Sequence, residues 1–336
     1  MKQWKTWLGF IISVGIIYLA FRGINVRLLI ANLQQADYRY LLPIIAIIFL
    51  TIALRAMRWG YLLRPVKQIG FHNLFEGILI SFMANNVLPV RMGEFVRAYV
   101  IGRSERISTS ASFATVVLER LFDGLTIVSL FVAVLTCVQL PAGNIPFKEA
   151  LLVGGAIAMA VCGLTVAILV LIKARTEWVL KVTVSLVRPF SAKLAQNGIA
   201  TIISFKKGLL AVESATTMVI AFCYSLMIWA IFCVAIYLMG LAFGLTLSLA
   251  ATCMVLLAIC LAVMIPSTPG YIGPYHASVA YALVLFNIPL EQALSFSIVF
   301  HAVNYLPVTL AGFLYLGRHH LTLKKIRAVE GKKAGK

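Results

Sequence analysis

The sequence contains no hydrophilic stretch long enough to fold as a separate soluble domain of ordinary size. Only 12% of the 336 residues are charged, whereas 62% are hydrophobic and the mean hydropathy is +0.98. A soluble domain cannot bury that much apolar surface, so the composition predicts a membrane protein that crosses the bilayer several times. We expect a single transmembrane domain over residues 1–317 and a basic cytoplasmic tail over residues 318–336.

The sequence also lacks the patterns of metal sites and nucleotide-driven enzymes. None of the six cysteines forms a C-x-x-C pair, and the five histidines do not have the spacing of a zinc site. There is no nucleotide-binding loop and no nucleophile elbow, which argues against ATP hydrolysis by this chain. We therefore expect no metal and no cofactor, and a chain that is not itself an enzyme.

Acidic residues are scarce: 11 Asp and Glu stand against 29 Lys and Arg, which gives a net charge of +18. When the apolar runs are taken as membrane spans, most of the basic residues fall on the face that holds the N-terminus. Membrane proteins concentrate Lys and Arg in their cytoplasmic loops. The pattern predicts a multi-pass protein of the cell (inner) membrane with both termini in the cytoplasm, and no nucleic-acid partner.

Apolar runs lie near residues 7–21, 40–63, 71–88, 108–139, 150–172, 215–241, 246–265, 275–287 and 291–317. A bilayer crossing takes about 20 apolar residues, and some of these runs are shorter. We therefore interpret residues 71–103 and 246–288 as helical hairpins that enter and leave by the same face. The predicted fold is all-α and integral to the membrane, with six spanning helices and two re-entrant helical hairpins in an inverted repeat.

The two halves of this repeat cover about residues 1–140 and about residues 150–317. Each half reads span, span, hairpin, span, and the second half starts from the opposite face. Residues 175–212 are predicted to be a cytoplasmic interfacial linker, because their apolar residues fall on one helical stripe opposite Lys206 and Lys207.

Prolines and glycines interrupt both predicted hairpins. The residues that we expect to shape the hairpins are Pro89, Gly93, Pro266, Pro269, Gly270 and Gly273. In transporters with inverted repeats, paired broken helices of this kind enclose the substrate site near the middle of the bilayer.

Polar side chains gather at these breaks. A freed helix end offers unpaired amides, and arginines add bidentate donors that suit a phosphate. The candidate substrate-binding residues are Asn85, Asn86, Arg91, Glu94, Arg97, Arg120, Ser267, Thr268 and Tyr271. In the alternative interpretation the arginines only set the topology, and Glu94 neutralises either Arg91 or Arg97.

Three charged residues lie inside a predicted span, namely Glu119, Arg120 and Asp123. Each intramembrane charge costs at least about 2.5 kcal/mol on insertion scales, so three together indicate a cavity or a buried network. With His301 and Asn304 of the last span, Glu119 and Asp123 are candidates for a proton relay or for charge balance. The alternative is a self-contained ion-pair network that locks helices together.

Arg55 and Arg58 lie one turn apart near the cytoplasmic end of the second predicted span. Two interpretations remain open for this pair. They bind a lipid phosphate, or they are anchors whose long side chains reach the membrane surface.

The patterns N-x-x-P-x-R-x-G-E at residues 86–94 and E-R-x-x-D at residues 119–123, with Pro-Ser-Thr-Pro-Gly-Tyr-Ile-Gly at 266–273, resemble the lysylphosphatidylglycerol synthase transmembrane-region family. This family is also called the flippase-like domain family, and the resemblance covers nearly the whole chain. Its motif residues correspond here to Asn86, Pro89, Arg91, Gly93, Glu94, Arg97, Glu119, Arg120, Asp123, Pro269, Gly270 and Gly273.

The resemblance implies an inner-membrane protein that moves lipids between leaflets, or helps to move them. Relatives include the flippase half of multiple peptide resistance factor, and others look like helpers in polyprenyl-linked glycan or hopanoid handling. The synthases carry a soluble C-terminal aminoacyl-transfer domain, whereas this sequence ends in a short basic tail. We therefore expect that it does not make lysyl-lipid itself.

Three functions follow from these features. The first is a flippase-like lipid translocase that moves an anionic phospholipid or a polyprenyl-phosphate-linked lipid through a polar cavity between the two hairpins, with anionic membrane lipids as its partners. The second is an accessory membrane protein for a lipid-linked glycan or a lipid-modifying enzyme, with a membrane glycosyltransferase as its partner. The third is a membrane-embedded transferase or phosphatase that uses Glu119 or Asp123 as a base.

Overall fold

The computed structural model describes residues 15–16, 22–88, 92–137, 145–265 and 268–318. Every regular element in these ranges is a helix, and they contain no β-strand. The elements are α2 (Val26–Gln35), η1 (Tyr38–Tyr40), α3 (Leu41–Leu63), α4 (Phe71–Val87), α5 (Gly93–Ser104), α6 (Thr109–Cys137), α7 (Ile145–Ala174), α8 (Thr176–Val187), α9 (Ala192–Gly208), η2 (Leu209–Glu213), α10 (Ala215–Ala242), α11 (Leu249–Ala262), η3 (Pro269–Tyr271), α12 (Pro274–Val284) and α13 (Leu290–Arg318).

Four helical segments of the described chain are long and apolar enough to cross a bilayer: Tyr38–Leu63, Leu152–Ala174, Ala215–Ala242 and Leu290–Gly317. Helix α6 has 29 residues but carries charged side chains. The first predicted span, 7–21, lies almost entirely outside the described residues. The all-α prediction is confirmed for the described chain, whereas the arrangement of six spans and two re-entrant hairpins stays a prediction.

Two pairs of short helices occupy the segments predicted as hairpins. Helices α4 and α5 have 17 and 12 residues, and α11 and α12 have 14 and 11. At about 1.5 Å per residue, none of them matches the roughly 30 Å hydrocarbon core of a bilayer.

Each pair returns to the end of the bundle from which it starts. Lys67 before α4 and Glu105 after α5 form an ion pair with 2.8 Å between Nζ and Oε2. In the second pair, Gln292, which follows α12, donates a hydrogen bond of 3.0 Å to the carbonyl oxygen of Phe243, which precedes α11. Both pairs therefore have the geometry of hairpins.

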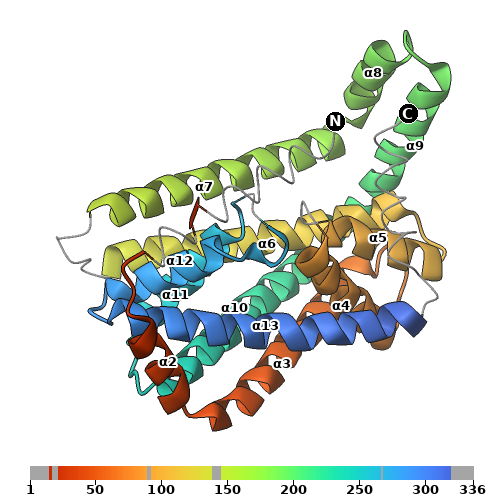
Figure 1. Ribbon diagram of the computed structural model, residues 1–336. Coiled ribbons are helices and arrows are strands. Elements are labelled where there is room, and N and C mark those ends of the chain that lie inside the picture. The colour runs from red at the N-terminus through yellow and green to blue at the C-terminus, as the bar shows by residue number, and fades with distance from the viewer. Residues whose placement is uncertain (1–14, 17–21, 89–91, 138–144, 266–267, 319–336) are drawn as a thin grey trace.

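The two hairpins start from opposite ends of the bundle. Helices α3 and α10 pack side by side (Figure 1). The backbone N–H of Asp37, just before α3, donates to the carbonyl of Ala242, the last residue of α10, at 2.8 Å. The two helices are therefore antiparallel, and the chain leaves them at opposite ends to enter α4 and α11.

Glycines allow the close approaches and turns in the hairpins. Gly93 lies where α5 approaches α4, and a Cβ atom there would lie 2.1 Å from the carbonyl oxygen of Ser81. Gly270 and Gly273 have φ angles of 79° and 101°, which residues with a Cβ rarely adopt. Of the prolines named from the sequence, Pro269 begins η3, while Pro89 and Pro266 lie outside the described residues.

Helices α7, α8 and α9 lie at the edge of the molecule. Helix α7 runs along α6, and α8 and α9 form a pair that projects from the bundle (Figure 1). The end of α9 packs tightly on α6, because a Cβ atom at Gly208 would lie 2.2 Å from the carbonyl oxygen of Ala111. The α8–α9 pair occupies the segment predicted as an interfacial linker, and Phe190 between its helices is 88% exposed.

Candidate functional site

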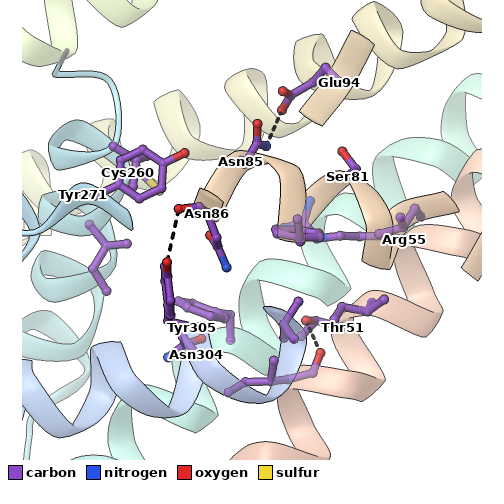
Figure 2. A pocket seen from close by; sticks show the side chains of 18 of the residues that line it. Thr51, Arg55, Ser81, Asn85, Asn86, Glu94, Cys260, Tyr271, Asn304 and Tyr305 are labelled. Atoms are coloured by element: carbon purple, nitrogen blue, oxygen red, sulfur yellow. Dashed lines mark hydrogen bonds between the residues drawn. The ribbon is translucent and has the colours of Figure 1, made fainter. Parts of the chain in front are cut away.

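A cavity of about 230 Å³ lies between the two hairpins and the long helices α3, α6, α10 and α13 (Figure 2). We call it the polar cavity. Its lining residues are Ile48, Thr51, Ile52, Arg55, Ile78, Ser81, Phe82, Asn85, Asn86, Glu94, Arg97, Arg120, Trp229, Phe232, Ile259, Cys260, Val263, Tyr271, Tyr275, His301, Asn304, Tyr305 and Val308.

The polar cavity brings together many residues that the sequence singled out. Asn85, Asn86, Glu94, Arg97, Arg120, Tyr271, His301 and Asn304 all line it. Thr268, Glu119 and Asp123 do not line it, although Glu119 and Asp123 bind the arginines that do. Arg91 and Ser267 lie outside the described residues.

Asn85 connects the two helices of the first hairpin. Helix α4 ends at Val87, and the backbone of Leu88 is already extended, with φ −92° and ψ 143°. The side-chain oxygen of Asn85 accepts a hydrogen bond of 2.7 Å from the backbone N–H of Gly93, where α5 begins. Its amide nitrogen donates to Glu94 at 3.4 Å. The amide thus binds an otherwise unpaired donor at the start of α5.

Asn86 connects the first hairpin to α13. Its side-chain amide donates to the hydroxyl of Thr309 at 2.7 Å, and its backbone carbonyl accepts from the hydroxyl of Tyr305 at 3.2 Å. Both contacts cross from one half of the chain to the other, so they hold one wall of the polar cavity against the last helix.

Glu119 of α6 is completely buried between two arginines. Arg97 of α5 contacts one of its oxygens at 2.5 Å, and Arg58 of α3 contacts the other at 3.2 Å. Arg97 therefore pairs with Glu119, and its guanidinium also lies 4.4 Å from the centre of the Trp59 ring. Of the two arginines that Glu94 could neutralise, Arg97 forms its ion pair with Glu119 instead, whereas Arg91 lies outside the described residues.

Asp123, one turn further along α6, accepts from Arg58 at 2.6 Å and from Arg55 at 3.2 Å. Arg120 lies 3.3 Å from it, at a spacing of i,i+3 on the same helix. The indole nitrogen of Trp229 adds a further donor at 3.3 Å. Helices α3, α6 and α10 are therefore joined at this carboxylate.

The structure corrects the interpretation of Arg55 and Arg58 as surface anchors. Arg58 is 0% exposed and also donates to the hydroxyl of Ser225 at 2.5 Å, so it can neither reach the membrane surface nor bind a lipid phosphate. Arg55 is buried too, but it lines the polar cavity. Both arginines point inward because a buried carboxylate without a partner would be far more costly than a buried pair.

The buried cluster has more arginines than carboxylates. In the described chain, the buried Arg55, Arg58 and Arg97 stand against the buried Glu119 and Asp123, which leaves one excess positive charge. The less buried Arg120 and Glu94 also line the cavity, and their charges cancel. The Nε atom of Arg97 is buried and has no hydrogen-bond partner among the described residues. The cluster thus has a spare buried donor and an uncompensated charge, and an anion would satisfy both.

Both carboxylates of α6 already accept bonds from arginines. Glu119 receives two guanidiniums and Asp123 receives three. The oxygens of both carboxylates are thus engaged by guanidiniums, which favours charge balance over a proton relay or a catalytic base.

Aromatic and histidine side chains line the opposite part of the cavity. His301 Nε2 lies 2.8 Å from the carbonyl oxygen of Gly270, which links α13 to the second hairpin. The ring of His301 lies 4.6 Å from that of Tyr275 and 5.4 Å from that of Tyr305, measured between centroids. The Tyr275 hydroxyl is buried and has no hydrogen-bond partner within the described ranges.

Comparison with known proteins shows the family of the chain. The family model of the lysylphosphatidylglycerol synthase transmembrane region matches residues 6–312. The chain belongs to this family. No solved structure matches it.

Several relatives are UPF0104 membrane proteins. One from Methanothermobacter thermautotrophicus is 28% identical over 254 residues, which cover 72% of this chain and 74% of the relative. One from Pyrococcus horikoshii is 23% identical over 347 residues, covering 94% and 98%. A shorter match of 125 residues, 36% of this chain and 20% of the relative, is 33% identical to the glycosyltransferase AglD of Haloferax volcanii.

Several residues of the site could not be identified from the sequence. Arg55 and Arg58 were named without their partners, while Tyr275, Trp229 and Ser225 were not named. For the arginines a signal was present: two cations one turn apart on an apolar helix require buried partners, and α6 was the span with carboxylates to offer. A single tyrosine, tryptophan or serine in an apolar helix carries no comparable signal.

Proposed function

We propose that this membrane protein is a lipid translocase, which moves a phospholipid or a polyprenyl-phosphate-linked lipid with an anionic headgroup between leaflets. The main support for this proposal is the excess positive charge at the polar cavity, together with the Nε of Arg97, which has no partner in the described chain. A buried cationic cluster is costly unless an anion completes it, and a phosphodiester supplies one negative charge and several acceptors.

In this proposal the chain forms six spans and two re-entrant hairpins in an inverted repeat, with both termini in the cytoplasm of the cell inner membrane. The short hairpin helices, their return to the same end and the antiparallel packing of α3 and α10 support the arrangement. The uneven distribution of Lys and Arg supports the orientation.

The polar cavity would receive the headgroup while the lipid tails stay in the bilayer. Arg55, Arg97 and Arg120 line the cavity and would donate to the phosphate. Glu119 and Asp123 lie behind them and hold the guanidiniums in position. Arg120 is the best residue for a test, because its side chain is 40% exposed and it contributes least to the buried network.

The test is reconstitution of the purified protein into vesicles that carry a headgroup-labelled anionic lipid, with its appearance in the opposite leaflet followed over time. We expect Arg120→Gln to slow transfer about tenfold or more, because one charge-assisted contact to phosphate is lost. Arg188→Gln, on an exposed residue outside the cavity, is the matched control and should leave the rate unchanged. Transfer by the native protein that is no faster than in empty vesicles would refute the proposal.

A second candidate is an accessory protein for a lipid-linked glycan enzyme. The stretch similar to the glycosyltransferase AglD supports it, since that protein carries a related segment within a longer chain. Co-purification of a glycosyltransferase in a fixed ratio, with no lipid transfer by the isolated chain, would favour this function over the first.

A further inference from the structure

The two sides of the polar cavity differ in chemistry. Figure 2 shows Arg55 on one side and Tyr271, Asn304 and Tyr305 on the other, with Asn86 near the latter. The arginines of the lining all contact Glu119 or Asp123, so they belong to one cluster.

We call the opposite part of the cavity the neutral side. It is formed by Tyr271, Tyr275, His301, Asn304 and Tyr305. In the described chain it contains no carboxylate, lysine or arginine.

The neutral side offers groups that bind hydroxyls. Tyr275 is 5% exposed. Its hydroxyl is buried and has no hydrogen-bond partner among the residues that the structure describes. A buried hydroxyl that makes no hydrogen bond carries a desolvation penalty that a ligand can remove. A tyrosine hydroxyl both donates and accepts, so it suits a ligand hydroxyl.

Asn304 and His301 complete this surface. The amide nitrogen of Asn304 donates to the carbonyl of Phe300 in its own helix at 2.8 Å, so its side-chain oxygen is the group left to accept a bond. The Nε2 of His301 donates to the carbonyl oxygen of Gly270, and its ring contacts those of Tyr275 and Tyr305. Flat rings with a few fixed polar atoms are typical of sites for small uncharged groups.

The charge of the cluster limits the headgroup further. One excess positive charge is balanced by a headgroup with a net charge of −1, such as a phosphodiester with an uncharged substituent. An amine on the substituent would return the occupied cavity to a net positive charge and would place an ammonium on the neutral side without a carboxylate partner. Burying an unpaired ammonium is strongly unfavourable.

We propose that the headgroup is a phosphodiester whose substituent is uncharged and carries hydroxyls, and that amine and aminoacyl headgroups are rejected. The phosphate lies at the arginines and the hydroxyls lie against Tyr275 and Asn304. The inference rests on the proposed function only in taking the polar cavity as the lipid site. Glycerophospholipids with a glycerol headgroup and polyprenyl phosphosugars both carry this chemistry.

The first experiment measures lipid binding to the purified full-length protein in detergent by native mass spectrometry. The probes are phosphatidylglycerol, its lysyl ester and phosphatidylethanolamine with identical acyl chains, and a polyprenyl phosphoglucose. We expect at least one of the two hydroxylated phosphodiesters to bind about tenfold or more tightly than the lysyl ester and phosphatidylethanolamine. Equal affinities, or tighter binding of either amine lipid, would overturn the inference, while the relative affinity of the two hydroxylated lipids identifies the source.

A second experiment uses Tyr275→Phe, which removes only the unpartnered hydroxyl. We expect its melting temperature in detergent to stay the same or rise, while affinity for the preferred hydroxylated lipid falls about threefold to tenfold. The matched control is Tyr281→Phe on the same helix, whose side chain is exposed and does not line the cavity. An unchanged affinity in Tyr275→Phe, with the native preference intact, would contradict the assignment of the hydroxyl.

These measurements separate the headgroup inference from the proposed function, because binding in detergent needs no transfer between leaflets. A protein that selects the hydroxylated phosphodiester but moves no lipid in vesicles supports the inference and refutes the translocase. A protein that moves anionic lipids while binding them and the amine lipids equally does the reverse.

Discussion

Asp123 accepts bonds from three arginines and one indole, which come from α3, α6 and α10. A single carboxylate therefore holds three long helices together in the middle of an apolar protein. Such a buried pair is no better for stability than well-packed apolar residues, but the loss of one partner leaves an uncompensated charge.

We expect Asp123→Asn to lower the free energy of unfolding by about 3–5 kcal/mol, because Arg58 would remain buried with one carboxylate fewer. The matched control is Glu213→Gln, since the exposed Lys173–Glu213 pair is 3.7 Å long and should contribute less than about 1 kcal/mol. Denaturation of the purified proteins in detergent measures both. Equal losses in the two variants would show that the buried network is not what stabilises the bundle.

Among the helices, the contact between α4 and α5 is the tightest constraint on the first hairpin. Gly93 permits it, because its backbone lies against that of α4 and next to the Asn85 side chain. Any Cβ atom at this position must push α5 away from α4, and α5 carries Glu94 and Arg97, which line the polar cavity.

We expect Gly93→Ala to destabilise the protein by about 1–3 kcal/mol through overpacking, and to reduce lipid transfer. Gly163→Ala in α7 is the control, and its effect on stability should have the opposite sign, because nothing lies within 4 Å of a Cβ atom there. Alanine is favoured over glycine in a helix by about 0.5–1 kcal/mol, so this variant should be slightly more stable. Thermal denaturation of both variants tests the pair, and a stable Gly93→Ala protein would show that the two helices can separate at little cost.

The open end of the first hairpin is closed by Glu105, which accepts bonds from Lys67 at 2.8 Å and from Asn73 at 2.6 Å. This loop lies outside the spanning helices. The hydrogen bond from Lys67 holds the pKa of the Glu105 carboxyl below its ordinary value of 4.5. Because the pKa is lowered on folding, the contact stabilises the protein fully above pH 4.5, and this contribution is lost as the pH falls through the lowered pKa.

We therefore expect the native protein to lose more stability than Glu105→Gln when the pH is lowered from neutrality to below 4.5, since the amide has no proton to gain. Melting temperatures of both proteins across this range are the measurement. Parallel pH profiles for the two proteins would contradict the role of the carboxylate.

For the whole molecule, the two hairpins and the antiparallel pair α3–α10 predict which segments are exposed on each face of the membrane. Arg103, at the end of α5, should lie on the cytoplasmic face, and Thr246, before α11, on the other. In a background without native cysteines, we expect Arg103→Cys to react with an impermeant maleimide only in inside-out vesicles. Thr246→Cys should react only from the other side. Reaction of both from the same face would rule out the inverted repeat.

The sequence allowed much of this architecture to be anticipated. Composition implied a membrane protein, and the lengths of the apolar runs separated long helices from the short pairs α4–α5 and α11–α12. The Pro and Gly breaks pointed to residues such as Asn86 and Glu94 that line the polar cavity. These features are local, because they depend on how many consecutive residues are apolar and where the backbone must turn.

The sequence by itself determined the helical class, the places where the helices break and the excess of positive charge. Only the tertiary structure decided which charges pair, bringing Arg58 to Glu119 and Asp123 across 61 and 65 residues, and Tyr275 to the neutral side of the cavity. Pairing depends on distances between helices that are remote in sequence, and these distances cannot be derived from local sequence patterns. The need to neutralise buried charge is local in origin, but its solution is a property of the assembled bundle.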